Sequence, residues 1–200
     1  MMKIVPDPPP LRPSTIIQTA LTPFCSCNDA HEALFNVSAG IPAEDALRHV
    51  AQHLQSAYQA SHHIYVNITC GDNGLHWATL WALDAAKVLV EALRDGIDDA
   101  VVKPTPEGDV FVPGTVRKTA SAPFCLLGSG DKHLFSVRSH VPAEDVLVHV
   151  SLYLQSAHAT ANELCRQTPK SEKGMHWAAL HAIEVAQALV EALLDGSDSV

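Results

Sequence analysis

The chain has 200 residues, of which 47% are hydrophobic, so it is long enough to bury a substantial core. Its formal net charge of −9 at pH 7 argues against binding to the phosphate backbone of nucleic acids and to acidic membrane surfaces. Its apolar stretches, such as AAKVLVEAL, are interrupted by charge well short of the about 20 residues that span a bilayer, so we expect no membrane segment.

The N-terminus and the cysteines predict a cytoplasmic location. The opening MMKIVPDPPPLRPS contains no apolar run of the about 7–15 residues that a cleavable secretory signal needs. The five cysteines include a single Cys-x-Cys and no other paired spacing, which favours reduced thiols over a disulfide framework or a zinc ribbon. Export by a route without a cleavable signal stays open.

An internal repeat covers most of the chain. Residues 19–100 align with residues 119–200 without a gap, and 34 of these 82 positions are identical. A match of this length is the mark of a tandem duplication. We therefore divide the chain into a Pro-rich leader (1–33), a first helical-hairpin repeat (34–96), a linker with a second leader (97–133) and a second helical-hairpin repeat (134–196).

Each repeat is predicted to begin with a short strand. The sequences are LFNV at 34–37 and LFSV at 134–137, and the first is followed by a Ser-Ala-Gly turn. A strand this short needs a partner for its backbone groups. We expect the two strands to pair with each other, antiparallel, across a two-fold axis.

The next segment of each repeat predicts a long helix. Apolar or small residues recur at alternating spacings of three and four, beginning with Leu47, Val50 and Leu54. Pro42 and Pro142 suit the first position of these helices.

A second helix is predicted over about 76–94 and 176–194, with Asp-Gly after each as a stop signal. Its polar residues Asp84, Lys87 and Glu91 form a narrow stripe, so the rest of the helix must pack against more than one neighbour. The predicted fold is therefore mainly α, with two repeated strand-helix-helix units. They form a pseudo-two-fold four-helix bundle with a small two-stranded antiparallel ribbon, and we expect the repeats to share one core.

The PAED motif at the start of the first helix raises the question of a reactive cluster. Glu44 and Asp45 lie in the first turn, where the helix macrodipole favours negative charge. Asp45 and His49 are four residues apart and can pair on the surface. We interpret the motif, which recurs at Glu144, Asp145 and His149, as an exposed capping cluster.

A metal site is the alternative interpretation. His49 and His53 have the i, i+4 spacing of two ligands for one ion, and Asp45 could be a third. The second repeat has Tyr153 in place of the second histidine, and the chain contains neither HExxH nor Cys-x-x-Cys. The sequence thus predicts no cofactor and no specific metal site beyond these three candidates.

A His-Trp pair opens the second helix of each repeat. A tryptophan at this position can seal the end of a bundle, or its amphipathic ring can anchor a partner. No nucleophile motif or phosphate-binding glycine loop occurs, so we expect no catalytic residues and lean against an enzyme. The candidate interaction surface comprises His76, Trp77, His176, Trp177, Asp45, His49, Asp145 and His149.

Three segments, KIVPDPPP, LFSVRSHVPAEDVLVHVSLYL and GMHWAALHAIEVAQALVEALLDG, resemble a pseudomonad family known only as a domain of unknown function. The resemblance implies a small bacterial cytoplasmic protein in which one such block occurs twice. It implies no activity, ligand or site residues.

Two functional classes follow from these patterns. The first is a non-enzymatic protein-interaction or regulatory module, with an unknown protein partner or with self-association. The alternative is a small-molecule or metal-binding protein that uses surface histidines. If single-copy relatives are two-fold dimers, fusion of two protomers would give a pseudo-two-fold monomer whose halves can diverge.

Overall fold

The computed structural model describes residues 15–25, 33–67, 73–100, 115–126 and 133–197. The Pro-rich parts of the two leaders, at 1–14 and 101–114, lie outside the described residues, as do Cys27 and Cys70.

Each repeat forms two short strands followed by two long helices. The first repeat contributes β1 (Thr22–Phe24), β2 (Phe35–Val37), α1 (Ala43–Asn67) and α2 (Asn73–Ala100). The second contributes β3 (Ala122–Leu126), β4 (His133–Val137), α3 (Ala143–Gln167), the short 3-10 helix η1 (Lys170–Glu172) and α4 (Lys173–Ser197). The predicted mainly α fold, with strand and helical-hairpin units occurring twice, is confirmed.

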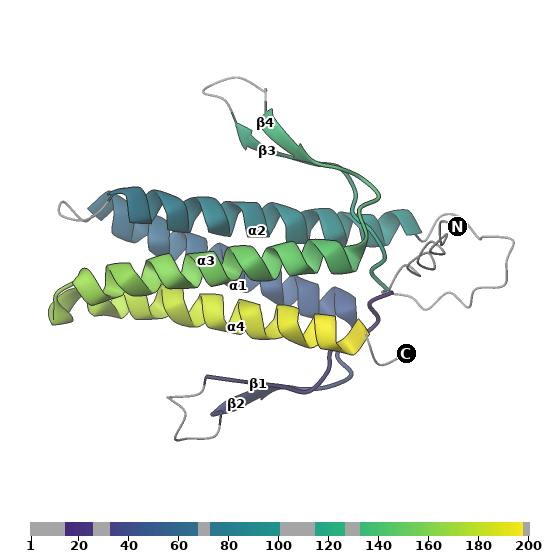
Figure 1. The fold of residues 1–200 in the computed structure, drawn as a ribbon, viewed down its shortest axis with the longest axis horizontal. Helices are drawn as coiled ribbons and strands as arrows, with labels where there is room; N and C mark the ends of the chain where they lie inside the picture. The colour runs from purple at the N-terminus through teal and green to yellow at the C-terminus, as the bar shows by residue number, and fades with distance from the viewer. Residues whose placement is uncertain (1–14, 26–32, 68–72, 101–114, 127–132, 198–200) are drawn as a thin grey trace, which may run out of the picture.

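The four long helices lie side by side in one bundle (Figure 1). Within each repeat the two helices form a hairpin, α1 with α2 and α3 with α4. Between the repeats, α1 packs on α4 and α2 packs on α3. The apolar spacing places Leu47 and Leu54 of α1, with Leu147 and Leu154 of α3, at positions no more than 1% exposed. Residues of both repeats thus contribute to the same hydrophobic core.

The predicted pairing of residues 34–37 with 134–137 is wrong. β2 pairs with β1 of its own repeat, with Phe24 opposite Phe35, and β4 pairs with β3 in the same way. The two repeats pair instead at Ile16 and Val116, which exchange backbone hydrogen bonds of 3.1 and 2.9 Å. Because these two residues are equivalent in the repeats, their antiparallel bridge marks the pseudo-two-fold axis.

Each ribbon packs on a helix of the other repeat. The β1–β2 ribbon contacts α4, and the β3–β4 ribbon contacts α2. The two ribbons consequently lie on opposite sides of the bundle (Figure 1). On each side of the bundle, side chains of a ribbon from one repeat therefore meet side chains of a helix from the other repeat, although they are far apart in the sequence.

The predicted ends of the second helices are also wrong, because both glycines lie inside their helices. α2 continues through Gly96 to Ala100, and α4 continues through Gly196 to Ser197. A Cβ atom at Gly196 would overlap the backbone carbonyl of Gln18, and one at Gly96 would overlap that of Lys118. The glycines therefore permit a segment of one repeat to lie against a helix of the other.

This close approach is supported by hydrogen bonds between the repeats. The amide of Ala20 donates to the carbonyl oxygen of Ala192 at 2.7 Å, and the amide of Ala120 donates to that of Ala92 at 2.8 Å. Backbone groups of the two repeats are thus interlocked at both equivalent positions.

The first helices begin one residue later than predicted. Pro142 precedes α3 with extended backbone angles (φ −55°, ψ 139°) and makes no side-chain capping bond. The amide of Ala143 donates instead to the carbonyl oxygen of Arg117 at 2.9 Å, and Ala43 bonds to Ile17 at the same distance. The preceding segment therefore satisfies a backbone amide that is unpaired at the start of a helix.

A buried threonine holds the turn before each first helix. Thr19, which is 2% exposed, donates its hydroxyl to the carbonyl oxygen of Ser38 at 2.7 Å and accepts from the amide of Ile41 at 3.1 Å. The equivalent Thr119 makes the same two bonds at 2.6 and 3.1 Å. These bonds tie β2 and β4 to the segments that cross between the repeats.

By length and composition alone, α4 is long and apolar enough to span a membrane. An 18-residue window within it has a mean hydropathy of 1.4. In the structure 56% of this window is buried, and α4 packs on α1 and α3. The core helix of a bundle meets the same criteria of length and composition.

Candidate functional site

The acids of the PAED motif bind an arginine rather than the predicted histidine. Arg48 contacts Asp45 at 2.7 Å and Glu44 at 3.1 Å, and all three side chains are about half exposed. His49 and His149 are exposed, as is Asp145, and position 148 of the second repeat is Val148. Exposed pairs of this kind contribute little to stability, typically about 0–1 kcal/mol.

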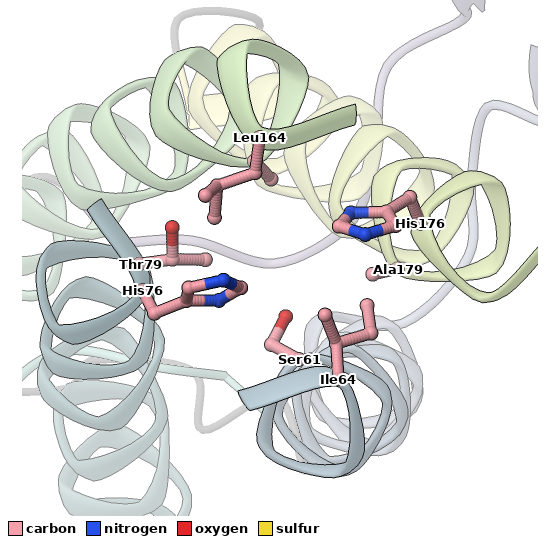
Figure 2. A pocket seen from close by; sticks show the side chains of 8 residues that line it. Ser61, Ile64, His76, Thr79, Leu164, His176 and Ala179 are labelled. Atoms are coloured by element: carbon pink, nitrogen blue, oxygen red, sulfur yellow. The ribbon is translucent and has the colours of Figure 1, made fainter. Parts of the chain in front are cut away.

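His76 and His176 are not on the surface, although the sequence placed them there. They are 5% and 3% exposed, and both rings point into the space between the helices (Figure 2). Oγ1 of Thr168 lies 3.0 Å from Nε2 of His176, and the ring of Tyr65 packs against the ring of His76. The first turns of α2 and α4 are covered by the ends of α1 and α3, which explains the burial.

The space between these histidines is small. The cavity has a volume of about 10 Å³, which is about the room for one water molecule. Its polar groups include the hydroxyl of Ser61 and that of Thr79, which bonds to Thr160 at 2.7 Å. We therefore assign His76 and His176 to the packing of the bundle rather than to ligand binding.

Trp77 and Trp177 are exposed, at 60% and 62%. The ring of Trp77 meets Tyr65 edge-on with a centroid separation of 5.9 Å. The second repeat has Cys165 at the position of Tyr65, so the two tryptophans have different neighbours.

A second aromatic group lies where the β3–β4 ribbon meets α2. Trp81 of α2, Phe124 of β3 and Phe135 of β4 form an aromatic cluster with centroid separations of 5.3 to 6.2 Å. Trp81 is 43% exposed and Phe135 is 45% exposed. In the second repeat the position equivalent to Trp81 is His181.

The equivalent position on the other side of the bundle is polar. Sγ of Cys25, after β1, lies 4.0 Å from Nδ1 of His181 and 3.6 Å from Oε2 of Glu184, both on α4. Nδ1 of His181 and Oε2 of Glu184 are 4.0 Å apart. The other carboxylate oxygen of Glu184 lies 3.4 Å from Nε2 of His158 on α3. We call Cys25, His181 and Glu184 the Cys-His-Glu cluster.

His53 of α1 belongs to the surroundings of this cluster. Partial burial lowers its pKa below the ordinary value, and the nearby imidazoles of His49 and His181 lower it further. The lowered pKa favours the neutral imidazole of His53. In the equivalent surroundings on the other side, burial and the carboxylate of Asp84 raise the pKa of Tyr58.

The predicted metal candidates are thus only partly brought together. His53 lies near both His49 and His181, whereas Asp45 is paired with Arg48. Among the described residues, the donor atoms that converge are those of the Cys-His-Glu cluster. Local spacing could not reveal it, because Cys25 and His181 are 156 residues apart in different repeats.

The two repeats match two family models. Residues 19–96 match a family described as "Protein of unknown function (DUF3077)", and residues 134–196 match one described as "Family of unknown function (DUF6124)". Neither a curated protein nor a solved structure matches the chain. The resemblance to a domain of unknown function is confirmed, although the repeats match two distinct families where one was expected. The chain consists of two units, each of which matches a family of unknown function.

Proposed function

We propose that the protein is a non-enzymatic interaction module that binds a protein partner through the aromatic cluster of Trp81, Phe124 and Phe135. The observation that carries this proposal is a tryptophan and a phenylalanine, both more than 40% exposed, held in contact by a fixed ribbon. Half-exposed aromatic side chains of this kind are the usual anchors of protein interfaces.

The fold does not require this cluster. On the other side of the bundle, Phe24 and Phe35 form the equivalent pair of rings, with centroids 5.6 Å apart, while His181 replaces the tryptophan. The β1–β2 ribbon nevertheless packs on α4 as the β3–β4 ribbon packs on α2. Packing of a ribbon on its helix therefore does not depend on the tryptophan, because the β1–β2 ribbon packs on α4 without one.

The first turns of α3 expose two apolar residues at positions where α1 has polar ones. Val148 and Leu152 on α3 are 46% and 55% exposed, and the equivalent residues of α1 are Arg48 and Gln52. Val148 and Leu152 add exposed apolar side chains to α3, the helix that packs beside α2. The partner we propose presents apolar and aromatic side chains, and we propose that binding occurs in the cytoplasm.

Site-specific photocrosslinking tests this proposal. A photoreactive phenylalanine analogue is placed at Phe135 and, as the matched control, at the equivalent Phe35, which has a similar exposed fraction of 52%. In cells of the native host, we expect a discrete crosslinked protein from position 135 and none from position 35. Trp81→His should abolish the crosslink without unfolding the chain.

Two outcomes would contradict the proposal. Equal crosslinking at both positions would show that exposure alone accounts for the contacts. A crosslink at position 135 that survives Trp81→His would show that the tryptophan is not the anchor.

A further inference from the structure

We propose that the Cys-His-Glu cluster binds one divalent transition-metal ion of the zinc class. Its three donors are a thiol from the end of β1 and two side chains from α4, so the site exists only because the two repeats are interlocked. It lies on the opposite side of the bundle from the aromatic cluster and is independent of the proposed protein interface.

The distances between the donor atoms fit such an ion. Zinc bonds of about 2.0–2.3 Å in a tetrahedral arrangement place neighbouring ligand atoms about 3.4–3.6 Å apart. The observed separations are 3.6 Å for Cys25 to Glu184 and 4.0 Å for each of the pairs that include His181. A movement of about half an ångström by the exposed His181 ring closes the triangle around an ion.

The local backbone directs the three donors to one point. His181 and Glu184 are three residues apart and share one face of α4. Cys25 has a left-handed backbone angle (φ 59°), uncommon for a residue with a side chain, and it follows the last residue of β1. The sulfur lies against α4 as a result.

The donor set favours zinc over magnesium or calcium. A cysteine sulfur binds metals as the thiolate and is a soft ligand, whereas magnesium and calcium take oxygen ligands. Binding therefore releases the thiol proton of Cys25, which in the metal-free protein is directed at the carboxylate of Glu184. Three protein ligands leave a fourth position for water.

His158 is placed to orient the carboxylate of Glu184. Its Nε2 lies 3.4 Å from Oε1 of Glu184, so it can hold the carboxylate while the other oxygen, Oε2, faces the metal. The side chain of His181 is 59% exposed, which gives an ion access from solvent.

The equivalent position in the other half provides a built-in control. Cys125 is retained there with the same backbone angle of 59°, but Trp81, Asp84 and Tyr58 stand in place of His181, Glu184 and His158. A tryptophan ring offers no metal ligand, because its indole nitrogen is only a hydrogen-bond donor. We therefore expect one ion per chain and not two.

Cobalt titration of the full-length, metal-free and reduced protein tests the site. Co²⁺ bound by a thiolate gives a ligand-to-metal charge-transfer absorption that histidine and carboxylate ligands do not give. We expect this band to saturate at one equivalent, to vanish on addition of Zn²⁺ and to persist when Mg²⁺ is added in excess.

The variants separate this site from the other cysteines and histidines. Cys25→Ala should abolish the band, whereas Cys125→Ala should retain it. His181→Ala should weaken binding at least tenfold, while Ala in place of the exposed His63 should leave it unchanged. His158→Ala should weaken Co²⁺ binding by about 10–100-fold, as is usual for residues that orient a ligand.

Three results would overturn the proposal. Binding without a thiolate band would show that surface histidines alone hold the ion. A band that survives in Cys25→Ala would place the metal at another cysteine. Circular dichroism checks that Cys25→Ala is folded. If it is unfolded, Cys25→Ser is used in its place. Retention of the full thiolate band in Cys25→Ser would contradict the site in the same way.

Discussion

The close approach of the two repeats at Gly196 predicts a specific loss of stability on adding one methyl group. Gly196→Ala places a Cβ atom on the carbonyl oxygen of Gln18, which belongs to the backbone and cannot rotate away. The crossing segment must move, and with it the 2.7 Å hydrogen bond from Ala20 to Ala192. The perturbation therefore acts on the contact between the repeats rather than on either hairpin alone.

The magnitude follows from three contributions. Overpacking of a tight contact costs about 1–3 kcal/mol. Loss of the hydrogen bond adds about 1 kcal/mol. Alanine favours the helix over glycine by about 1 kcal/mol, which offsets the second contribution. We expect Gly196→Ala to lower the free energy of unfolding by about 1–3 kcal/mol.

The same helix contains the matched control. A Cβ atom added at Gly174 would meet no heavy atom of another segment within 4 Å, so Gly174→Ala should be neutral or stabilising by up to about 1 kcal/mol. The assay is urea unfolding followed by circular dichroism and tryptophan fluorescence, with the midpoint and slope of each transition compared. A Gly196→Ala protein as stable as the parent, or equal losses from both substitutions, would refute the close contact between the repeats.

Three further predictions concern the buried threonine, the pH response and the aromatic cluster. Thr19→Val removes the buried hydroxyl that bonds Ser38 and Ile41 and should cost about 1–3 kcal/mol in urea unfolding, whereas Ser56→Ala on the exposed face should cost under about 0.5 kcal/mol. The lowered pKa of His53 means that the unfolded chain binds more protons, so the free energy of unfolding should fall as pH drops from about 7 through 6.5. His53→Gln should flatten this slope. Trp81→His loses ring contacts of about 0.5–1.5 kcal/mol each but should keep the fold, as judged by circular dichroism, because His181 occupies the equivalent position.

The long helices were predictable because their apolar periodicity persists over many turns. The spacing of Leu47, Val50 and Leu54 is maintained through α1, and no alternative structure buries all of these residues at once. The bundle then followed from the wide apolar face of the second helix. Gapless repetition indicated the two-fold arrangement.

The ribbons and the helix ends were not predictable in the same way. β2 has three residues, too few for side-chain alternation to specify a register, and its partner β1 contains Pro23, a residue type that is depleted in strands. A glycine near the end of a helix is compatible with a stop signal or with a close contact. Only the position of Gln18 in the folded chain distinguishes these two roles for Gly196.

The candidate sites depended on contacts between repeats, which spacing along the chain does not encode. Asp45, His49 and His53 attracted attention because they are close in sequence, yet the donors that converge come from the end of β1 and from α4. A signal did exist in the comparison of the repeats. The cysteine before each ribbon loop is retained, while Trp81 and His181 differ at one equivalent position.

The central claim is that equivalent positions in the two halves have diverged, one into a metal site and the other into an apolar surface. X-ray absorption at the zinc edge, on reduced full-length protein loaded with zinc, tests this claim most directly. We predict one zinc per chain with one sulfur and otherwise nitrogen or oxygen ligands, and no sulfur ligand in Cys25→Ala. A zinc shell without sulfur, or two ions with one in each half, would contradict the account.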